Sequence, residues 1–135
     1  MRILGIDYGS ARVGVALGDT ETRVASPWRV IANEDVEETI DRLGEIAKQE
    51  RAEKFVVGMP RPLADQLGES DQTREVKVFI ERLARLSFPI EEENETLSSA
   101  LAAKQAKEMG ETKKRDDLAA TVILQGWLDR YELSS

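Results

Sequence analysis

A carboxylate stands inside an apolar stretch near the start of the chain, "ILGIDYGSARVGVALGD" at residues 3–19. The alternation of a β-strand places Asp7 and Gly5 on one face and Ile6 and Tyr8 on the other. Burying a carboxylate in such a strand costs several kcal/mol unless it is paired, protonated or bound to a cation. We therefore expect Asp7 either to have a structural partner or to bind a ligand.

The residue types that are missing limit the chemistry. The 135 residues include no cysteine and no histidine, which excludes disulfides, thiolate zinc sites and an imidazole base or metal ligand. Catalysis would have to use carboxylates, hydroxyls, lysines or a hard cation held by oxygen atoms. The net charge of −7 argues against a general nucleic-acid coat protein, which would be basic. It does not exclude a local site, because a cluster of metal-binding carboxylates itself adds negative charge.

The length and hydropathy indicate one domain over residues 1–135, long enough to build a hydrophobic core. No apolar run approaches the roughly 20 residues of a membrane span. No signal peptide precedes the first strand, so we expect a cytoplasmic protein.

Strand patterns come first along the chain and then alternate with helix patterns. The periodicity predicts strands at 2–8, 12–18, 23–31, 54–58 and about 88–94, and helices at about 33–52, 71–86, 98–109 and 116–131. Asn33 or Asp35 can cap the first helix, and Pro27 suggests that the third strand lies at an edge of the sheet or bends. Hairpin-linked strands followed by this alternation predict a mixed α/β sheet with helices packed on it.

Three carboxylates come from the ends of these elements. Asp7 lies near the carboxyl end of the first strand, Glu95 at the end of the last strand, and Asp116 at the start of the last helix. Ligands of such sheets bind beyond the carboxyl ends of parallel strands. Carboxylates gathered there cannot all ionise unless cations neutralise them, and Mg²⁺ and Mn²⁺ prefer carboxylate and water oxygens. We therefore expect these three residues to form a catalytic metal site.

Four motifs in order resemble the YqgF family over nearly the whole chain: "GIDYGSARVGVALGD", "VVGMP", "ETLSSALA" and "KKRDDLAATVILQGWLD". That family comprises nucleases of precursor 16S ribosomal RNA, similar in fold to RuvC-type Holliday-junction resolvases and ribonuclease H. The resemblance implies that Asp7 is the acid of the first strand and Asp116 the acid of the D-x-x-A-A motif. The middle motif usually reads D-E-R-L-S/T-T, so Glu95 is kept, whereas Asn94 and Thr96 replace an aspartate and an arginine.

The resemblance implies a ribonuclease H-like fold and a metal-dependent hydrolase that cleaves phosphodiester bonds and trims the 5′ end of 16S ribosomal RNA. Mg²⁺ or Mn²⁺ would be held by Asp7, Glu95 and Asp116, and would activate a water molecule. The expected partner is nucleic acid, with precursor ribosomal RNA first and branched DNA second. Resolving a junction would require a homodimer with two sites facing it. The basic residues expected to contact phosphates are Arg12, Arg61, Lys113, Lys114 and Arg115.

Two further groups of residues have a binding or a packing interpretation. We expect the substrate backbone to approach closely at Gly5, Gly9, Gly14 and Gly18. The apolar residues of the last helix are Leu118, Ala119, Val122, Ile123, Trp127 and Leu128. We interpret Trp127 as a core residue rather than a platform for stacking bases.

Each candidate residue also has a purely structural interpretation. Asp7 could be paired with an amide or an arginine, and Asp116 could be a helix cap. Glu95 could lie on a solvated loop, together with residues 91–93, and the KKR run could be a solvated charge cluster.

Other classes of function compete with the nuclease. A phosphate-binding module of the actin and sugar-kinase type has a similar first hairpin, but such proteins normally need two domains around a nucleotide. A catalytically weak or inactive binder of RNA, or of a ribosome or transcription partner, would agree with Asn94, Thr96 and the acidity. A Holliday-junction resolvase differs from the first proposal only in its substrate.

Overall fold

The computed structural model describes residues 1–59, 71–94 and 116–131. The elements are β1 (Arg2–Tyr8), β2 (Arg12–Asp19), β3 (Val24–Ala32), α1 (Val36–Gln49), β4 (Ala52–Met59), α2 (Asp71–Leu83), the 3₁₀ helix η2 (Ala84–Leu86), β5 (Ile90–Asn94) and α4 (Asp116–Tyr131). All the predicted strands are present, as are three of the predicted helices, while the helix predicted at 98–109 lies outside the described residues. None of the helices within these ranges is long and apolar enough to cross a membrane.

The strands form one five-stranded sheet in the order β3-β2-β1-β4-β5. β2 is antiparallel to β1 and β3, whereas β4 is parallel to β1 and β5 is parallel to β4. This arrangement confirms the mixed sheet that the sequence predicts. The parallel strands β1, β4 and β5 all end at the same edge of the sheet, at Tyr8, Met59 and Asn94.

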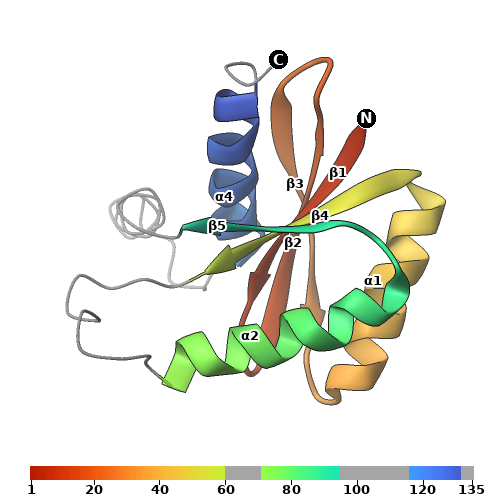
Figure 1. Cartoon of the computed structure of the whole chain (residues 1–135), viewed down its shortest axis with the longest axis vertical. Coiled ribbons are helices and arrows are strands. Elements are labelled where there is room, and N and C mark those ends of the chain that lie inside the picture. Colours follow the sequence, from red (N-terminus) through yellow and green to blue (C-terminus); the bar gives the residue numbers. More distant parts are fainter. Residues whose placement is uncertain (60–70, 95–115, 132–135) are drawn as a thin grey trace.

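Helices cover both faces of the sheet, with α1 and α2 on one face and α4 on the other (Figure 1). The alternation of β1 divides its side chains between two cores. Leu4 and Ile6 lie in the core beneath α1 and α2, whereas Ile3 lies in the core beneath α4. Tyr8 packs against the first core, its ring centroid 4.4 Å from that of Phe79 on α2. The predicted two-faced strand is confirmed.

Of the two predicted caps for α1, Asp35 is the residue that acts. Its carboxylate accepts a hydrogen bond of 2.9 Å from the backbone N–H of Glu37. Glu37 and Glu38 in the first turn and Lys48 in the last turn complement the helix dipole. The buried side of α1 consists of Thr39, Ile40, Leu43, Gly44, Ile46 and Ala47.

β3 forms one edge of the sheet, and its register against β2 shifts at a β-bulge beside Pro27. Proline cannot donate a ladder hydrogen bond and is therefore tolerated at such an edge. Gln125 of α4 attaches the helix to this strand, because its side chain accepts from the N–H of Ala25 at 2.9 Å and donates to the carbonyl of Arg23 at 2.8 Å.

α4 packs closely on β1 and β2 because glycines leave these strands bare. A Cβ atom at Gly5 would lie 2.7 Å from the Cβ of Leu124 and 3.1 Å from the carbonyl oxygen of Ala120. A Cβ at Gly18 would lie 2.8 Å from Cδ2 of Leu124, and one at Gly9 would lie 2.6 Å from a backbone oxygen of its own turn. The expectation that Gly5 and Gly18 admit the substrate backbone is therefore wrong, since α4 already occupies the space, whereas the missing Cβ of Gly9 makes room for its own turn.

The buried side of α4 consists of Ala120, Ile123, Leu124, Trp127 and Leu128. The interpretation of Trp127 as a core residue is confirmed. The other apolar residues named from the sequence, Leu118, Ala119 and Val122, are only half-buried. Because apolar residues occur on several sides of α4, periodicity alone did not identify its packed side.

Gly5→Ala is expected to lower the free energy of unfolding by about 1–3 kcal/mol, because the new methyl group meets the Cβ of Leu124 and helix backbone. The matched control is Gly18→Ala, whose methyl group meets the movable ends of Leu124 and Leu128, and we expect a smaller loss. Urea unfolding measures both. Equal losses, or none at Gly5, would contradict the close packing of backbone against α4.

Candidate active site

Asp7 lies one residue before the carboxyl end of the central strand. It pairs with Gly14 of β2, and the preceding residue, Ile6, pairs with Val57 of β4. By the alternation of β1, its half-buried side chain is on the face that carries α4. A carboxylate is thus held by rigid backbone at the edge where the parallel strands end, which is where sheets of this kind bind ligands.

A buried asparagine holds the turn that follows Asp7. Asn33 is only 7% exposed, and its side-chain amide donates to the carbonyl of Gly9 at 2.9 Å. Its backbone N–H donates to the carbonyl of Ala11 at 2.9 Å, and its side-chain oxygen accepts from the hydroxyl of Thr39 at 2.9 Å. The turn is therefore attached to α1. The sequence suggested only a capping role for Asn33, because a contact across 24 residues leaves no local pattern.

The register of α4 against the sheet is set by its contacts with the two glycines. Gly18, which pairs with Ile3, faces Leu124 and Leu128, whereas Gly5 faces Ala120 and Leu124. Contacts thus move toward the start of α4 as β1 proceeds toward its carboxyl end.

This register brings the start of α4 to the end of the sheet that carries Asp7. Asp7 lies two residues, or about 6.6 Å, beyond Gly5 along the strand. Asp116 lies four residues, or about 6 Å, before Ala120 along the helix. The backbone positions of Asp7 and Asp116 therefore lie at the same edge of the sheet, although the side chain of Asp116 is outside the described part of the structure.

An ion pair between a buried glutamate and an exposed arginine attaches the carboxyl end of β5 to α4. Glu93 is 5% exposed and accepts a hydrogen bond from the guanidinium of Arg130, which raises the pKa of Arg130. The interpretation of Glu93 as part of a solvated loop is therefore wrong. β5 ends at Asn94, and Glu95, which comes next in the sequence, lies outside the described residues.

A second ion pair joins β4 and β5 on the same face. The ammonium of Lys54 donates to the carboxylate of Glu91 and lies 5.2 Å from the ring centroid of Trp127. This hydrogen bond lowers the pKa of Glu91, and a hydrogen bond that the carboxylate accepts from the indole of Trp127 lowers it to a smaller extent, while partial burial opposes both. Glu91 also belongs to a strand, so the loop interpretation is wrong for it too.

The structure describes only part of the predicted site. Asp7 lies on β1, Arg12 is exposed at the start of β2, and Asp116 begins α4. The remaining predicted residues lie outside the described ranges: Glu95, Arg61, Lys113, Lys114 and Arg115. Within the described ranges, no three acidic side chains lie close enough together to hold a metal ion. The cluster of three carboxylates therefore remains a prediction.

The sequence of this chain is similar to one protein family over nearly its whole length. The family described as "RuvX: Holliday junction resolvase" matches residues 1–130. A protein of Desulforamulus reducens named "Putative pre-16S rRNA nuclease" is 36% identical, over 96% of this chain and 97% of the relative. A protein of the same name from Symbiobacterium thermophilum is 38% identical, over 96% and 92% of the two chains.

Among solved structures, "T. thermophilus RuvC in complex with Holliday junction substrate" superposes with a TM-score of 0.64, covering 100% of this chain and 98% of that one. The two sequences are 13% identical, so this likeness shows the fold alone. The predicted ribonuclease H-like fold is confirmed.

Asn33→Ala is expected to lower the free energy of unfolding by about 1–3 kcal/mol, because it removes the side-chain donor to the Gly9 carbonyl and one of the two acceptors of the Thr39 hydroxyl. Urea unfolding measures the loss, and hydrogen exchange of the amides in residues 9–12 locates it. Thr39→Ser, which keeps the hydroxyl, serves as the control and should lose less. Unchanged exchange in the turn of Asn33→Ala would show that Asn33 does not hold it.

Lys54→Met is expected to raise the pKa of Glu91 toward its ordinary value of 4.5. In the unaltered protein, the stabilisation from this pair is present above the ordinary carboxyl pKa and is lost as the pH falls through the lowered one. Carboxyl titration by NMR measures the shift, and Lys48→Met at the exposed end of α1 is the control. Equal Glu91 titration curves for the two variants would rule out Lys54 as the cause.

Proposed function

Because the chain belongs to the RuvX family, also called YqgF, we propose that it is a nuclease that hydrolyses phosphodiester bonds of precursor 16S ribosomal RNA. The two relatives described above, both named "Putative pre-16S rRNA nuclease", match over 97% and 92% of their length. The observation that supports the proposal best is the position of Asp7 at the carboxyl edge of the sheet, where α4 begins with Asp116. We expect the protein to act in the cytoplasm.

The donor set suits a hard divalent cation. The chain contains no histidine or cysteine, so carboxylates are the strongest metal ligands available, and Mg²⁺ and Mn²⁺ prefer them. We propose that Asp7, Glu95 and Asp116 hold the cation. When bound, it would supply an activated water and charge stabilisation for phosphodiester hydrolysis.

The scaffold contributes rigidity to this site. The backbone of Asp7 is held by its pairing with Gly14 of β2, by the pairing of the preceding Ile6 with β4, and by the turn that Asn33 anchors. Asp116 starts a helix that packs without a gap on Gly5. Ligands on such elements keep their positions better than ligands on loops. Arg12, Arg61, Lys113, Lys114 and Arg115 remain the candidates for phosphate contacts.

A four-way DNA junction is the second candidate substrate. The description of the family and the resemblance in fold to the junction-bound T. thermophilus RuvC favour it. Junction resolution would need a homodimer, because two sites must cut symmetrically. A monomer in solution that cleaves precursor RNA would therefore favour the first candidate.

Asp7→Asn is expected to reduce cleavage at least about a hundredfold, because removing a cation ligand costs several kcal/mol of transition-state stabilisation. The assay uses end-labelled precursor 16S RNA and a labelled four-way junction, each with Mn²⁺ and with chelator. Asp41→Asn, the same change on the exposed side of α1, is the matched control.

A second measurement separates loss of the metal from loss of the fold. Mn²⁺ should raise the melting temperature of the unaltered protein and of Asp41→Asn, but raise that of Asp7→Asn much less. Cleavage by Asp7→Asn at the rate of the parent, or cleavage that persists in chelator, would refute the proposed site. Absence of Mn²⁺-dependent cleavage on both substrates would instead indicate an inactive binding module.

A further inference from the structure

A pocket lies on the other face of the sheet, beside the proposed active site. It has a volume of about 310 Å³ and is lined by Tyr8, Val36, Arg74, Glu75, Val78, Phe79 and Arg82. Tyr8 follows Asp7 directly in β1, so their side chains leave the strand on opposite faces from Cα atoms about 3.8 Å apart. The pocket is therefore at the same carboxyl edge, on the α2 side.

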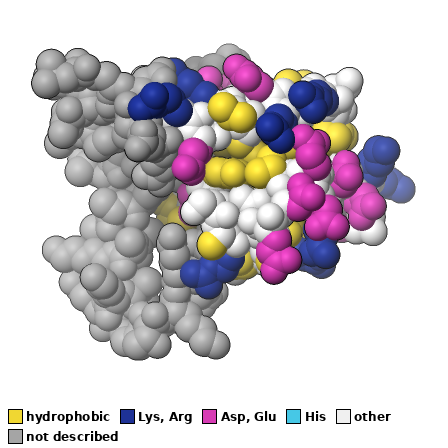
Figure 2. Space-filling view, turned by 90° about the horizontal axis from the view of Figure 1, so that it is seen from below, with side chains coloured by type: hydrophobic (Ala, Val, Ile, Leu, Met, Phe, Trp, Pro, Cys, Tyr) yellow, Lys and Arg dark blue, Asp and Glu magenta, His cyan; other side chains and the backbone are white. Residues whose placement is uncertain are grey.

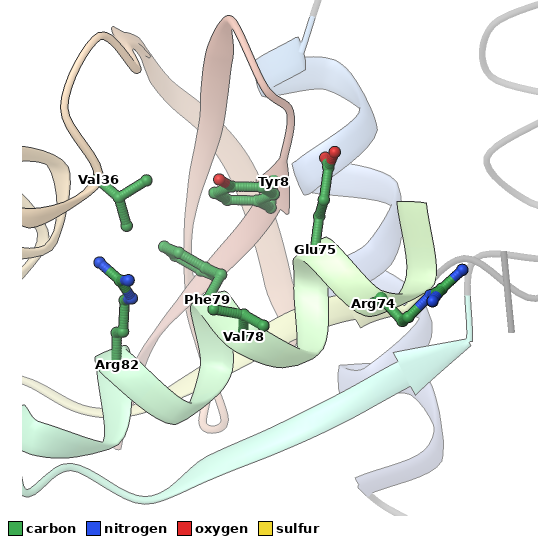
Figure 3. A pocket seen from close by; sticks show the side chains of 7 residues that line it. All are labelled: Tyr8, Val36, Arg74, Glu75, Val78, Phe79 and Arg82. Atoms are coloured by element: carbon green, nitrogen blue, oxygen red, sulfur yellow. The ribbon is translucent and has the colours of Figure 1, made fainter. Parts of the chain in front are cut away.

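The floor of the pocket is formed by aromatic rings, and charged side chains border it. In Figure 3, the ring of Tyr8 lies over Phe79, with Val36 and Arg82 on one side and Glu75 on the other, and Arg74 lies further along α2. Figure 2 looks at the molecule from below and shows exposed hydrophobic side chains bordered by acidic and basic ones. Val78, which lines the pocket, is 48% exposed.

We propose that this pocket binds one unpaired nucleobase of the substrate strand, next to the cleaved phosphodiester. This inference rests on the proposed nuclease function. A strand that crosses the edge of the sheet with a phosphate at Asp7 would bring a neighbouring base to the face of Tyr8. Bases stack readily on aromatic side chains, and the flanking phosphates need cations.

The polar residues around the pocket suit a base and its phosphates. Arg82 is held in place by Glu37 of α1, at 2.9 Å, and its guanidinium has further N–H donors. The carboxylate of Glu75 can accept from the exocyclic amino group of a base. Arg74 and Arg82 lie eight residues apart on α2, or about 12 Å along the helix, so phosphates on either side of the base would each meet a cation.

The size of the pocket argues for a single base. Pockets for small molecules range from about 300 to 1,000 Å³, so this one is near the lower limit. The substrate must then be unpaired at this position, and a fully paired duplex should bind less well.

The test measures binding of a labelled 12-nucleotide single-stranded RNA in chelator, so that no cleavage is needed. Val78→Glu places a carboxylate in the pocket at an exposed helix position, and we expect about tenfold weaker binding. Val24→Glu makes the same change at a valine that is 57% exposed at the start of β3, where it pairs with Asp19 at the end of the sheet away from Asp7. It should weaken binding less than twofold, and circular dichroism checks the fold of both variants.

A second arm replaces one nucleotide at a time by an abasic unit. One abasic position should weaken binding to the unaltered protein but not to Val78→Glu, because both changes remove the same contact. If no position shows this coupling, or if Val24→Glu weakens binding equally, the proposal is overturned. Mononucleotides that bind as tightly as the oligonucleotide would also overturn it, in favour of a site for free nucleotides.

The binding test of the pocket can fail or succeed independently of the cleavage test of the nuclease proposal. Binding in chelator does not depend on Asp7 as a metal ligand, so the coupling can be present even if Asp7→Asn still cleaves. Conversely, cleavage that requires Asp7, with no coupling at Val78, would leave the nuclease proposal standing and refute the base pocket.

Discussion

The close contact between α4 and the glycines of the central strands is the constraint on which the rest of the structure depends. At Gly5, there is no room for even a methyl group between the strand and Leu124. Because protein interiors are closely packed and hardly compressible, α4 cannot slide along the sheet, and its register is fixed. That register decides that α4 begins at the carboxyl edge, where Asp7 lies.

Polar contacts also hold α4 and the turn after β1 in place. Gln125 attaches α4 to the backbone of β3 at one edge of the sheet, and Arg130 attaches it to Glu93 of β5 at the other. Between these edges, Asn33 holds the turn that follows β1. Each contact joins residues far apart in the sequence, and all of them position elements that end or begin at the proposed site.

In the proposed function, the central strand would serve two faces with two kinds of chemistry. Asp7 is on the face of α4, where a carboxylate suits a hard cation, and Tyr8 is on the face of α2, where a ring suits a base. Because neighbouring residues of a strand point to opposite sides, a substrate crossing this edge could reach both. The absence of histidine makes carboxylates the natural ligands for such a site.

Much of the fold followed from local patterns that the sequence shows directly. The alternation of β1, the cap at Asp35 and the edge position implied by Pro27 depend on neighbours within a few residues, and these were predicted correctly. The order of the motifs also identified the family, because the type and spacing of residues can be read from the sequence without knowing which residues are in contact. The sequence by itself thus determined the described elements and the fold class, and it singled out Asp7 as the candidate acid on the first strand.

Only the tertiary structure decided which of several compatible partners each side chain meets. It assigned Gly5 to α4 instead of to the substrate, and Asn33 to a distant turn instead of a helix cap. It also buried Glu93 in an ion pair with Arg130, where the sequence had suggested a solvated loop. The physical reason is that close packing and pairing across the sheet depend on distances between segments. Those distances have no local signature in the order of the residues.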